Sequence, residues 1–201
     1  MKKRVSKEAW LRKGLALLRA SGEGALTLDR LAKAMRRTKG SFYHHFEGQD
    51  DFRRALLASW EEDLTSAPIR AAASIADPLE RATALSRTVR ALDQDLDLAV
   101  RAWSLRDPLA RAAFATVDAR RLEAIQAIHA ASGAANPREL AIVEYLAFVG
   151  WQQLRGTLPP DVDAAALVRR ATAALAETSA VLPQATARRR RSRRTPRSVA
   201  Q

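Results

Sequence analysis

The placement of proline and glycine constrains the fold of this chain more than any other feature of its sequence. The stretches DPLE at Asp77 and NPRE at Asn136 each supply a cap residue, a proline for the first helical position and a glutamate that can reach back to the cap. DPLA at Asp107 supplies the cap and the proline. No run alternates polar and apolar residues for long enough to predict a strand. The sequence therefore predicts an all-α protein.

Apolar residues at helical spacing predict about nine helices. Their expected ranges are about 6–20, 28–35, 39–46, 49–65, 78–95, 98–106, 108–132, 137–156 and 163–182. Asp93 opens the stretch DQDLDL, which superficially resembles a calcium-binding loop. The stretch lacks the glycine and the glutamate that such a loop needs at its sixth and twelfth positions. We therefore interpret it as a helix end followed by a cap.

Composition excludes several classes of protein. Apolar residues make up 47% of the 201 residues, which is enough for a buried core. The absence of cysteine excludes a disulfide scaffold, a thiolate nucleophile and a cysteine-rich zinc site. No apolar run approaches the length of about 18 residues that a membrane span needs. We therefore expect a soluble cytoplasmic protein with no membrane partner.

The formal charge of +12 is concentrated at the two ends of the chain. Residues 1–48 carry 12 Lys and Arg against 4 Asp and Glu, whereas residues 65–182 carry 13 of each kind. Residues 183–201 carry seven arginines and no acidic residue, and without apolar periodicity this tail is expected to be disordered. Two basic ends suggest contact with a polyanion, although a basic surface can also serve solubility alone.

The stretch TKGSFYHHF, from Thr38 to Phe46, follows a short predicted helix after a turn of about three residues. Two short helices joined by a tight turn are typical of a helix-turn-helix, whose second helix enters the major groove of DNA. Phe42 and Phe46 are expected to face inward, against Leu31 and Met35. The outward positions carry groups suited to phosphate or base contacts. They are Lys39, Gly40, Ser41, Tyr43 and His44.

The chain offers no motif for catalysis or metal binding. His44 and His45 are adjacent, so their side chains point about 100° apart on a helix and cannot easily share a metal ion. His129 stands alone in a long predicted helix. A serine elbow, a glycine-rich phosphate loop and a paired-carboxylate motif are all missing. We therefore expect neither an enzyme nor a bound metal or cofactor.

The segment LTLDRLAKAMRRTKGSFYHHFEGQDDFRRAL resembles the N-terminal DNA-binding segment of tetracycline-repressor-like (TetR-family) transcriptional regulators. The resemblance covers about residues 6–60 and rests mainly on the lysine-glycine-serine-aromatic-tyrosine-x-histidine-phenylalanine pattern. Farther on it covers the layout, and RAWSLRDP at Arg101 is similar to a stretch common in these C-terminal domains. It implies a homodimer on an operator with two-fold symmetry, a C-terminal ligand-binding domain, and a dimer bundle built from the last two long helices. It also implies DNA contacts from Thr27, Lys39, Gly40, Ser41, Tyr43, His44 and His45.

Several positions depart from the family pattern. Arg36 and Arg37 stand in the turn where the family usually has glycine and an aliphatic residue, and an arginine in a left-handed turn costs about 1 kcal/mol relative to glycine. Gln49 stands where a lysine is common, and Asp29 stands where some members carry a base-reading arginine. Arg37, Thr38 and Gln49 complete the set of predicted DNA contacts.

These observations predict three parts. Residues 1–48 form a helix-turn-helix domain, and a helix at about 49–65 connects it to the rest. Residues 66–182 form a larger helical domain for ligand binding and dimerisation, and the tail at 183–201 follows it.

The larger domain holds most of the aromatic residues, and a mostly apolar pocket with a few polar groups is the usual composition of a small-molecule site. The candidate ligand-binding residues are Trp103, Phe114, His129, Tyr145, Phe148, Trp151 and Gln152. An aromatic residue at helical spacing belongs to the core more often than it contacts a ligand, by roughly two to one for any single residue. The family resemblance implies an unidentified small-molecule effector.

Two helices carry faces that suit a four-helix bundle with a second copy of the chain. Residues 140–154 are apolar almost all the way round, and residues 164–182 offer small side chains that permit close approach. The candidate interface residues are Leu140, Val143, Ala147, Leu167, Ala171, Ala174, Leu175 and Thr178. Packing within a single chain would explain the same pattern.

The sequence thus favours a ligand-released repressor that binds a palindromic, double-stranded DNA operator as a homodimer. Two other functions stay open. A protein that compacts DNA without sequence preference would also use the basic N-terminus and the arginine-rich tail. An enzyme or a small-molecule carrier would use the large helical domain.

Overall fold

The computed structural model describes residues 5–181, with the side chains of residues 5–177. This part of the chain is helical and contains no strand, which confirms the predicted all-α fold. The predicted disordered tail at 183–201 lies outside the described residues. In chain order the elements are α1 (Lys7–Ser21), the 3₁₀ turn η1 (Glu23–Ala25), α2 (Leu28–Met35), α3 (Lys39–Tyr43), α4 (Gln49–Glu61), the π-helical turn η2 (Glu62–Ser66), α5 (Ala67–Ala73), α6 (Pro78–Ala91), α7 (Gln94–Ser104), α8 (Pro108–Ala131), α9 (Pro137–Leu154) and α10 (Ala164–Val181).

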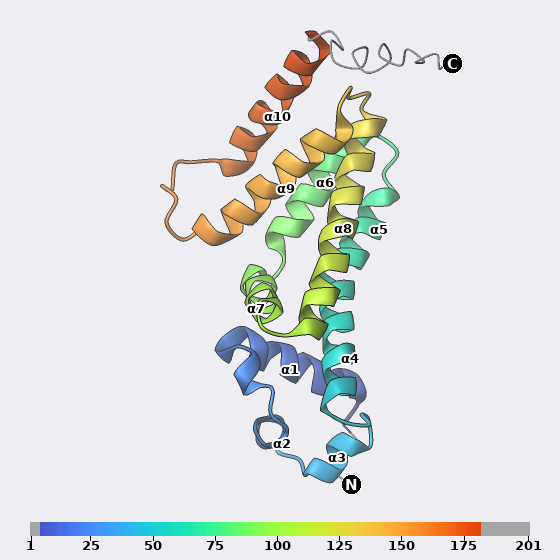
Figure 1. The fold of residues 1–201 in the computed structure, drawn as a ribbon, viewed down its shortest axis with the longest axis vertical. Coiled ribbons are helices and arrows are strands. Elements are labelled where there is room, and N and C mark those ends of the chain that lie inside the picture. The colour runs from blue at the N-terminus through green and yellow to red at the C-terminus, as the bar shows by residue number, and fades with distance from the viewer. Residues whose placement is uncertain (1–4, 182–201) are drawn as a thin grey trace, which may run out of the picture.

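Figure 1 shows an elongated molecule in which α1, α2 and α3 form one end, here termed the head. Helices α5 to α10 form the opposite part, here termed the body. Helix α4 runs from the head into the body and continues without a break through η2 into α5. With α4, η2 and α5 taken as one rod, the described residues form nine helices, as predicted.

Aspartate side chains cap the first turns of α6 and α7. The Asp77 carboxylate accepts a hydrogen bond from the backbone N–H of Glu80 at 2.7 Å. Asp93 caps α7 in the same way, because its carboxylate accepts from the backbone N–H of Leu96 at 3.1 Å. This cap starts α7 at Gln94, so the later start that the apolar spacing predicted is wrong.

The chain is helical beyond residue 65, where the sequence predicted the end of a helix. A proline usually interrupts a helix because it lacks the N–H donor. Here the π-helical turn η2 directly precedes α5, and Pro68 lies in the first turn of α5. The helix therefore continues past the proline to Ala73.

An aromatic core fills the space between α1, α3 and α4 in the head. Trp10, Phe42, Phe46 and Phe52 are at most 2% exposed, and the contacting rings have centroids 5.0 to 5.6 Å apart. Gly14 lets α1 approach α4 closely, because a Cβ at this position would stand 2.6 Å from Cζ of Phe52. The head is therefore packed to the point where one added methyl group would clash.

The same core continues from α4 into α7 and α8. The rings of Trp60 and Phe114 stack with centroids 5.1 Å apart, and Val100 and Trp103 of α7 are buried beside them. Ion pairs around this core include Arg19 with Asp93 of α7, at 3.0 Å. Exposed ion pairs contribute about 0–1 kcal/mol each, so the core holds the head against the body. One buried core contains residues from both sides of residue 48. The predicted domain boundary near that residue stays a prediction.

The far end of the body is packed less closely. Helix α6 has no buried side chain over its whole length. Thr172 is the only buried side chain of α10 within the described residues, and α10 lies beside α9 in Figure 1. Over residues 5–181, no helix has both the length and the apolar character to cross a membrane.

Candidate functional site

Helices α2 and α3 form a helix-turn-helix at the tip of the head. Thr27 caps α2, because its hydroxyl oxygen accepts from the backbone N–H of Arg30 at 3.3 Å. At the other end Arg36 adopts the left-handed conformation, with φ 52° and ψ 47°. The backbone N–H groups of Arg36 and Arg37 donate to the carbonyls of Lys33 and Ala32, at 3.1 and 2.9 Å. This pair of bonds is the Schellman end that usually has glycine at the left-handed position.

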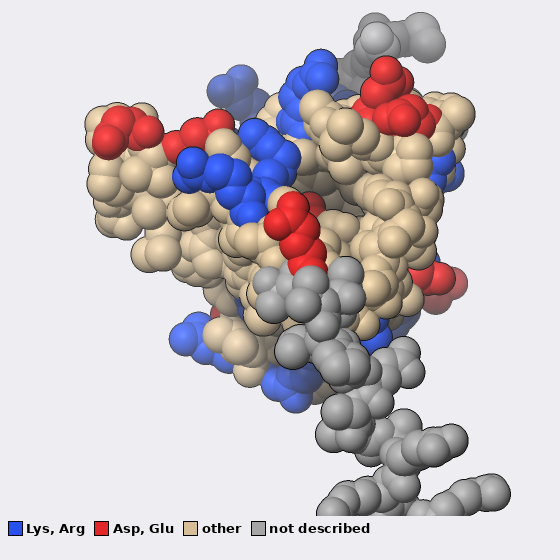
Figure 2. Space-filling model, turned by 90° about the horizontal axis from the view of Figure 1, so that it is seen from above, with Lys and Arg blue, Asp and Glu red and all other residues tan. Residues whose placement is uncertain are grey.

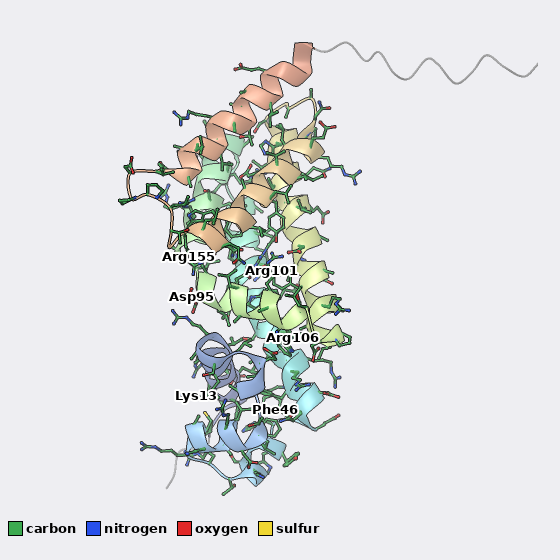
Figure 3. The ribbon with its side chains drawn as sticks, turned by 60° about the vertical axis from the view of Figure 1, so that its left-hand side comes forward. Lys13, Phe46, Asp95, Arg101, Arg106 and Arg155 are labelled. Atoms are coloured by element: carbon green, nitrogen blue, oxygen red, sulfur yellow. The ribbon has the colours of Figure 1, made fainter. Side chains whose placement is uncertain are left out.

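The inward side of α3 is fixed by the aromatic core. Phe42 is fully buried against Trp10 and Phe52, and Phe46 follows on the inward side, where it is labelled in Figure 3. The predicted inward positions are therefore confirmed. Helix α3 ends at Tyr43, earlier than predicted, although the backbone N–H of Phe46 still donates to the carbonyl of Phe42 at 3.1 Å.

The outward side of α3 presents polar groups to solvent. Tyr43 is 58% exposed, and Gly40 and His44 are exposed beside it. The ammonium of Lys39 lies 2.7 Å from the carboxylate of Asp29 on α2, and this hydrogen bond raises the pKa of Lys39. Lys39 is therefore a cation at neutral pH.

The remaining predicted DNA contacts surround α3. Ser41 and His45 are half-buried, and the His45 ring lies edge-on to Phe46. Thr38 is exposed and makes no capping hydrogen bond with its side chain. Gln49 Nε2 donates to the backbone carbonyl of Leu26 at 3.4 Å. Thr27 and Arg37 lie at the two ends of α2, exposed and half-buried respectively. Their part in DNA binding stays a prediction.

A cavity of about 1170 Å³ lies in the body, between α6, α8, α9, α10 and the region from Leu64 to Ile69. Four of the predicted ligand-binding residues line it: His129, Tyr145, Phe148 and Trp151. The sequence did not indicate the other lining residues as ligand contacts. Aliphatic positions that face a cavity have the same spacing as aliphatic positions that face a core.

Trp103, Phe114 and Gln152 do not line this cavity, and their predicted part in ligand binding stays a prediction. Trp103 and Phe114 are 2% and 3% exposed and belong to the core that α4 shares with α7 and α8. Gln152 is 1% exposed and donates to Gln94 Oε1 and Asp97 Oδ2, at 2.8 and 2.9 Å.

A buried polar cluster adjoins the cavity. Asp97 of α7 accepts hydrogen bonds from Arg121 at 2.8 and 3.1 Å, from Trp60 at 3.2 Å and from Gln152 at 2.9 Å. Arg121 also donates from Nε to the hydroxyl of Thr65 in η2, at 3.0 Å. Because Arg121 and Thr65 line the cavity, the cluster connects its wall to α7 and to the rod of α4 and η2.

The charges of this cluster are balanced. Burial would raise the pKa of the Asp97 carboxyl, but the hydrogen bonds and the charge of Arg121 outweigh burial and lower that pKa below its ordinary value. Arg101 pairs with Asp118 at 3.4 Å, and Figure 3 shows Arg101 in the interior of the body. Burial raises the pKa of Tyr145 to about 12, and its hydroxyl donates to Asp118 at 2.5 Å. At neutral pH two arginines therefore face two aspartates.

The candidate interface residues fall into different environments. Val143, Leu167 and Leu175 are 37%, 52% and 44% exposed, and Ala171 and Ala174 are also exposed. The side chain of Thr178 lies outside the described residues.

Leu140 and Ala147 are placed differently from the rest of that set. Leu140 is 4% exposed, and both residues line the cavity within one chain. Their predicted part in a dimer interface stays a prediction. An apolar helix that faces a cavity on one side and solvent on the other shows the same pattern in sequence as a helix at an interface.

Within residues 5–181, no group of three or more His, Asp or Glu side chains could hold a metal ion. The rings of His44 and His45 have centroids 6.5 Å apart and lie nearly perpendicular to each other.

Comparison with known proteins gives a partial match. No profile of a known protein family matches the sequence, and no solved structure matches it. A stretch of 57 residues is 35% identical to "Transcriptional regulator AcuR" from Cereibacter sphaeroides. The stretch is 28% of this chain, and it spans about a quarter of the regulator's own length (26%).

Proposed function

We propose that this protein is a sequence-specific DNA-binding transcriptional regulator of the TetR type. The observation that carries the proposal is the pair of α2 and α3, in which a buried aromatic core holds one side of α3 and leaves Lys39, Tyr43 and His44 outward. A helix presented in this way is how helix-turn-helix proteins read base edges in the major groove. The similarity to a transcriptional regulator supports a DNA-binding regulator in general.

Gly40 supports the same assignment. A Cβ at Gly40 would meet, among the described residues, only Oγ1 of Thr38, at the ordinary contact distance of 3.8 Å. The protein itself therefore does not require glycine at this position of a helix, where glycine costs about 1 kcal/mol relative to alanine. Close approach of the α3 backbone to DNA would explain it.

We further propose that the protein acts as a homodimer on a palindromic operator. The exposed apolar side chains of α9 and α10, among them Val143, Leu146 and Leu167, suit a self-complementary four-helix interface. Two heads related by a two-fold axis would meet half-sites about 34–36 Å apart.

Release by a ligand is the third part of the proposal. A ligand shifts the dimer away from its DNA-binding shape only if its affinity differs between the two shapes. The buried polar cluster offers a route for such a shift. Arg121 at the cavity wall holds Asp97 of α7, and Asp93 at the start of α7 pairs with Arg19 of the head.

Selection of bound fragments from the source genome tests the proposal. The full chain and residues 1–182 are compared at near-physiological salt, because binding through phosphates alone weakens steeply with salt. A regulator recovers the same few sites with two-fold symmetry in both forms. The genes beside those sites then indicate the effector.

The alternative function gives a different result. A protein that compacts DNA through its basic tail recovers fragments without sequence preference, and residues 1–182 recover few or none. Seven arginines at 183–201 favour this alternative, since each phosphate that they neutralise adds close to one unit to the salt slope.

A further inference from the structure

The cavity contains a ladder of aromatic rings along α9. Tyr145 and Phe148 stack with centroids 6.2 Å apart at 23°, and Phe148 and Trp151 follow at 5.9 Å and 31°. All three residues line the cavity. These rings are stacked or tilted against one another, so they give the cavity an aromatic wall, and an aromatic ligand gains from offset-stacked or edge-to-face contact with such a wall.

The facing walls are aliphatic and incompletely packed. Leu85 and Val89 of α6 line the cavity together with Ile125 and Ile128 of α8. Helix α6 has no buried side chain, although much of its cavity face is apolar. Side chains that border empty space lack the contacts that close packing supplies. An apolar occupant would supply them.

The charged groups inside the cavity already have contacts within the protein, although Arg90 contacts a ring and no carboxylate. Arg121 is bound to Asp97, and His129 lies 2.9 Å from the carboxylate of Glu144. The guanidinium of Arg90 lies over the ring of Trp151, 4.3 Å from its centroid, at the end of the aromatic ladder.

The charges at the cavity margin are also balanced. The exposed lining residues there include two cations, Arg87 and Arg169, and two anions, Asp163 and Glu177. Figure 2, seen from the α10 end, likewise shows small separate groups of basic and acidic side chains among uncharged surface.

Most of the hydroxyl groups that line the cavity also have partners. Tyr145 donates to Asp118, and Thr65 accepts from Arg121. Ser132 and Thr172 donate to backbone carbonyls of their own helices, and Ser86 is the exception. A net charge on a ligand would therefore lose hydration in a mostly apolar space and would meet charges that already have other contacts, which makes a charged ligand less favourable than a neutral one.

We propose that the effector is an uncharged, largely apolar aromatic molecule that packs against the row formed by the Tyr145, Phe148 and Trp151 rings. This inference rests on the proposed function as a ligand-responsive regulator and names the chemical class of its ligand. Occupation of the cavity completes the packing of α6 against α8 and α9. It also presses on the wall that contains Arg121, and through Arg121 on the buried polar cluster.

A matched set of probes tests this proposal on the full chain. 2-Acetylnaphthalene, 2-naphthoate and 2-naphthylmethylammonium share one ring system and differ in charge. Binding is measured at pH 7 by calorimetry and by the rise in unfolding temperature, since a ligand that binds the folded state stabilises it. The neutral probe should bind about tenfold or more tightly than either charged probe.

Variants locate the binding site. Phe148→Leu keeps apolar bulk and removes the stacked ring, so the neutral probe should bind roughly three- to tenfold more weakly. Leu105→Ala is the control, because Leu105 is 74% exposed and does not line the cavity. Tighter binding of either charged probe, or equal binding by Phe148→Leu and the unchanged protein, would overturn the proposal.

The assay separates this inference from the proposed function. Probe binding is measured without DNA, so a protein that fails to select genomic sites can still bind the neutral probe. A protein that selects its sites but binds no neutral probe contradicts the ligand class alone.

Discussion

The head and the far end of the body solve opposite packing problems with similar helices. In the head, four aromatic residues at most 2% exposed lock three helices together, and even a methyl group at Gly14 would clash. At the far end, α6 has no buried side chain and borders a cavity of about 1170 Å³. Under the proposed function, the head would need a fixed shape to match DNA, whereas the body would need space for a ligand. The difference between them is a difference in how completely the core is packed.

The two regions meet at a buried polar cluster. Asp97 contacts α4 through Trp60, α8 through Arg121 and α9 through Gln152. Two oxygens that accept four hydrogen bonds fix these helices at defined distances, because shifting any one of them leaves a buried donor without its acceptor. The cluster is therefore the element through which a change at the cavity would reach the rod of α4.

The largest expected effect comes from removing a ring of the head. Phe42→Ala should lower the free energy of unfolding by about 3–5 kcal/mol, because Phe42 is fully buried among three other rings. Phe148→Ala should cost less than about 2 kcal/mol, because Phe148 is half-buried beside empty space. Urea unfolding measures both values. Equal costs would remove the contrast between the two regions.

Asp97→Asn should lower the free energy of unfolding about as much as Phe42→Ala does, by about 3–5 kcal/mol at pH 7. The substitution leaves Arg121 as an unmatched buried cation. Asp95→Asn is the control and should cost about 1 kcal/mol or less, since Asp95 is 56% exposed beside Arg19 and Arg155. Figure 3 shows Asp95 and Arg155 next to each other at the surface.

The pH dependence of the Asp97 effect has a defined sign. The pKa of Asp97 is lower in the folded protein than the ordinary 3.8, so its stabilising contribution is present in full above that value. The contribution is lost as the pH falls below 3.8 and through the folded-state pKa. The difference in unfolding free energy between the unchanged protein and Asp97→Asn should therefore shrink in acid. A difference that stays constant down to pH 2 would show that the charge of Asp97 is not the cause.

A moderate effect is expected from Gly14→Ala. The added Cβ would stand 2.6 Å from the ring of Phe52 and 2.8 Å from Cδ1 of Leu56, and overpacking of this kind costs about 1–3 kcal/mol. Gly24→Ala serves as the control, because nothing lies within 4 Å of a Cβ at that position. Thermal unfolding that is unchanged by Gly14→Ala would mean that α1 and α4 are not closely packed.

The smallest effect is expected at the turn of the helix-turn-helix. Arg36→Gly should stabilise the protein by about 1 kcal/mol, because glycine adopts the left-handed conformation without strain. Lys33→Gly, in the preceding helix, should have the opposite sign and a similar size. Two changes of the same sign would contradict the left-handed turn at Arg36.

Local sequence signals predicted the parts of the fold that depend on neighbouring residues. The Asp77 cap and the inward positions of Phe42 and Phe46 follow from spacing within a few residues. The extension of α4 through η2 past Pro68 did not follow, because it depends on the π-helical turn that directly precedes α5. A rule that considers the proline alone does not include such a turn.

The candidate site divides in the same way. The outward residues of α3 were predicted, because a helix with one buried face leaves the other face exposed. The sequence did not separate Trp103, Phe114 and Gln152 from the residues that line the cavity, because an aromatic or amide side chain at helical spacing does not reveal whether it faces a cavity or a core. The ion pair of Lys39 with Asp29 and the cluster around Asp97 join different helices, and no single-helix pattern predicts such contacts.

A comparison of binding affinities tests whether α3 reads the DNA sequence. The affinity of the full chain for a selected genomic site is compared with that for an unrelated duplex of equal length, at fixed salt. The same comparison is made for the double variant Lys39→Ala, Tyr43→Ala, whose unfolding midpoint and oligomeric state should match those of the unchanged protein. We predict that the unchanged protein prefers the selected site by about 10³-fold or more, and that the double variant loses this preference. An undiminished preference in a folded double variant would show that another part of the molecule reads the sequence.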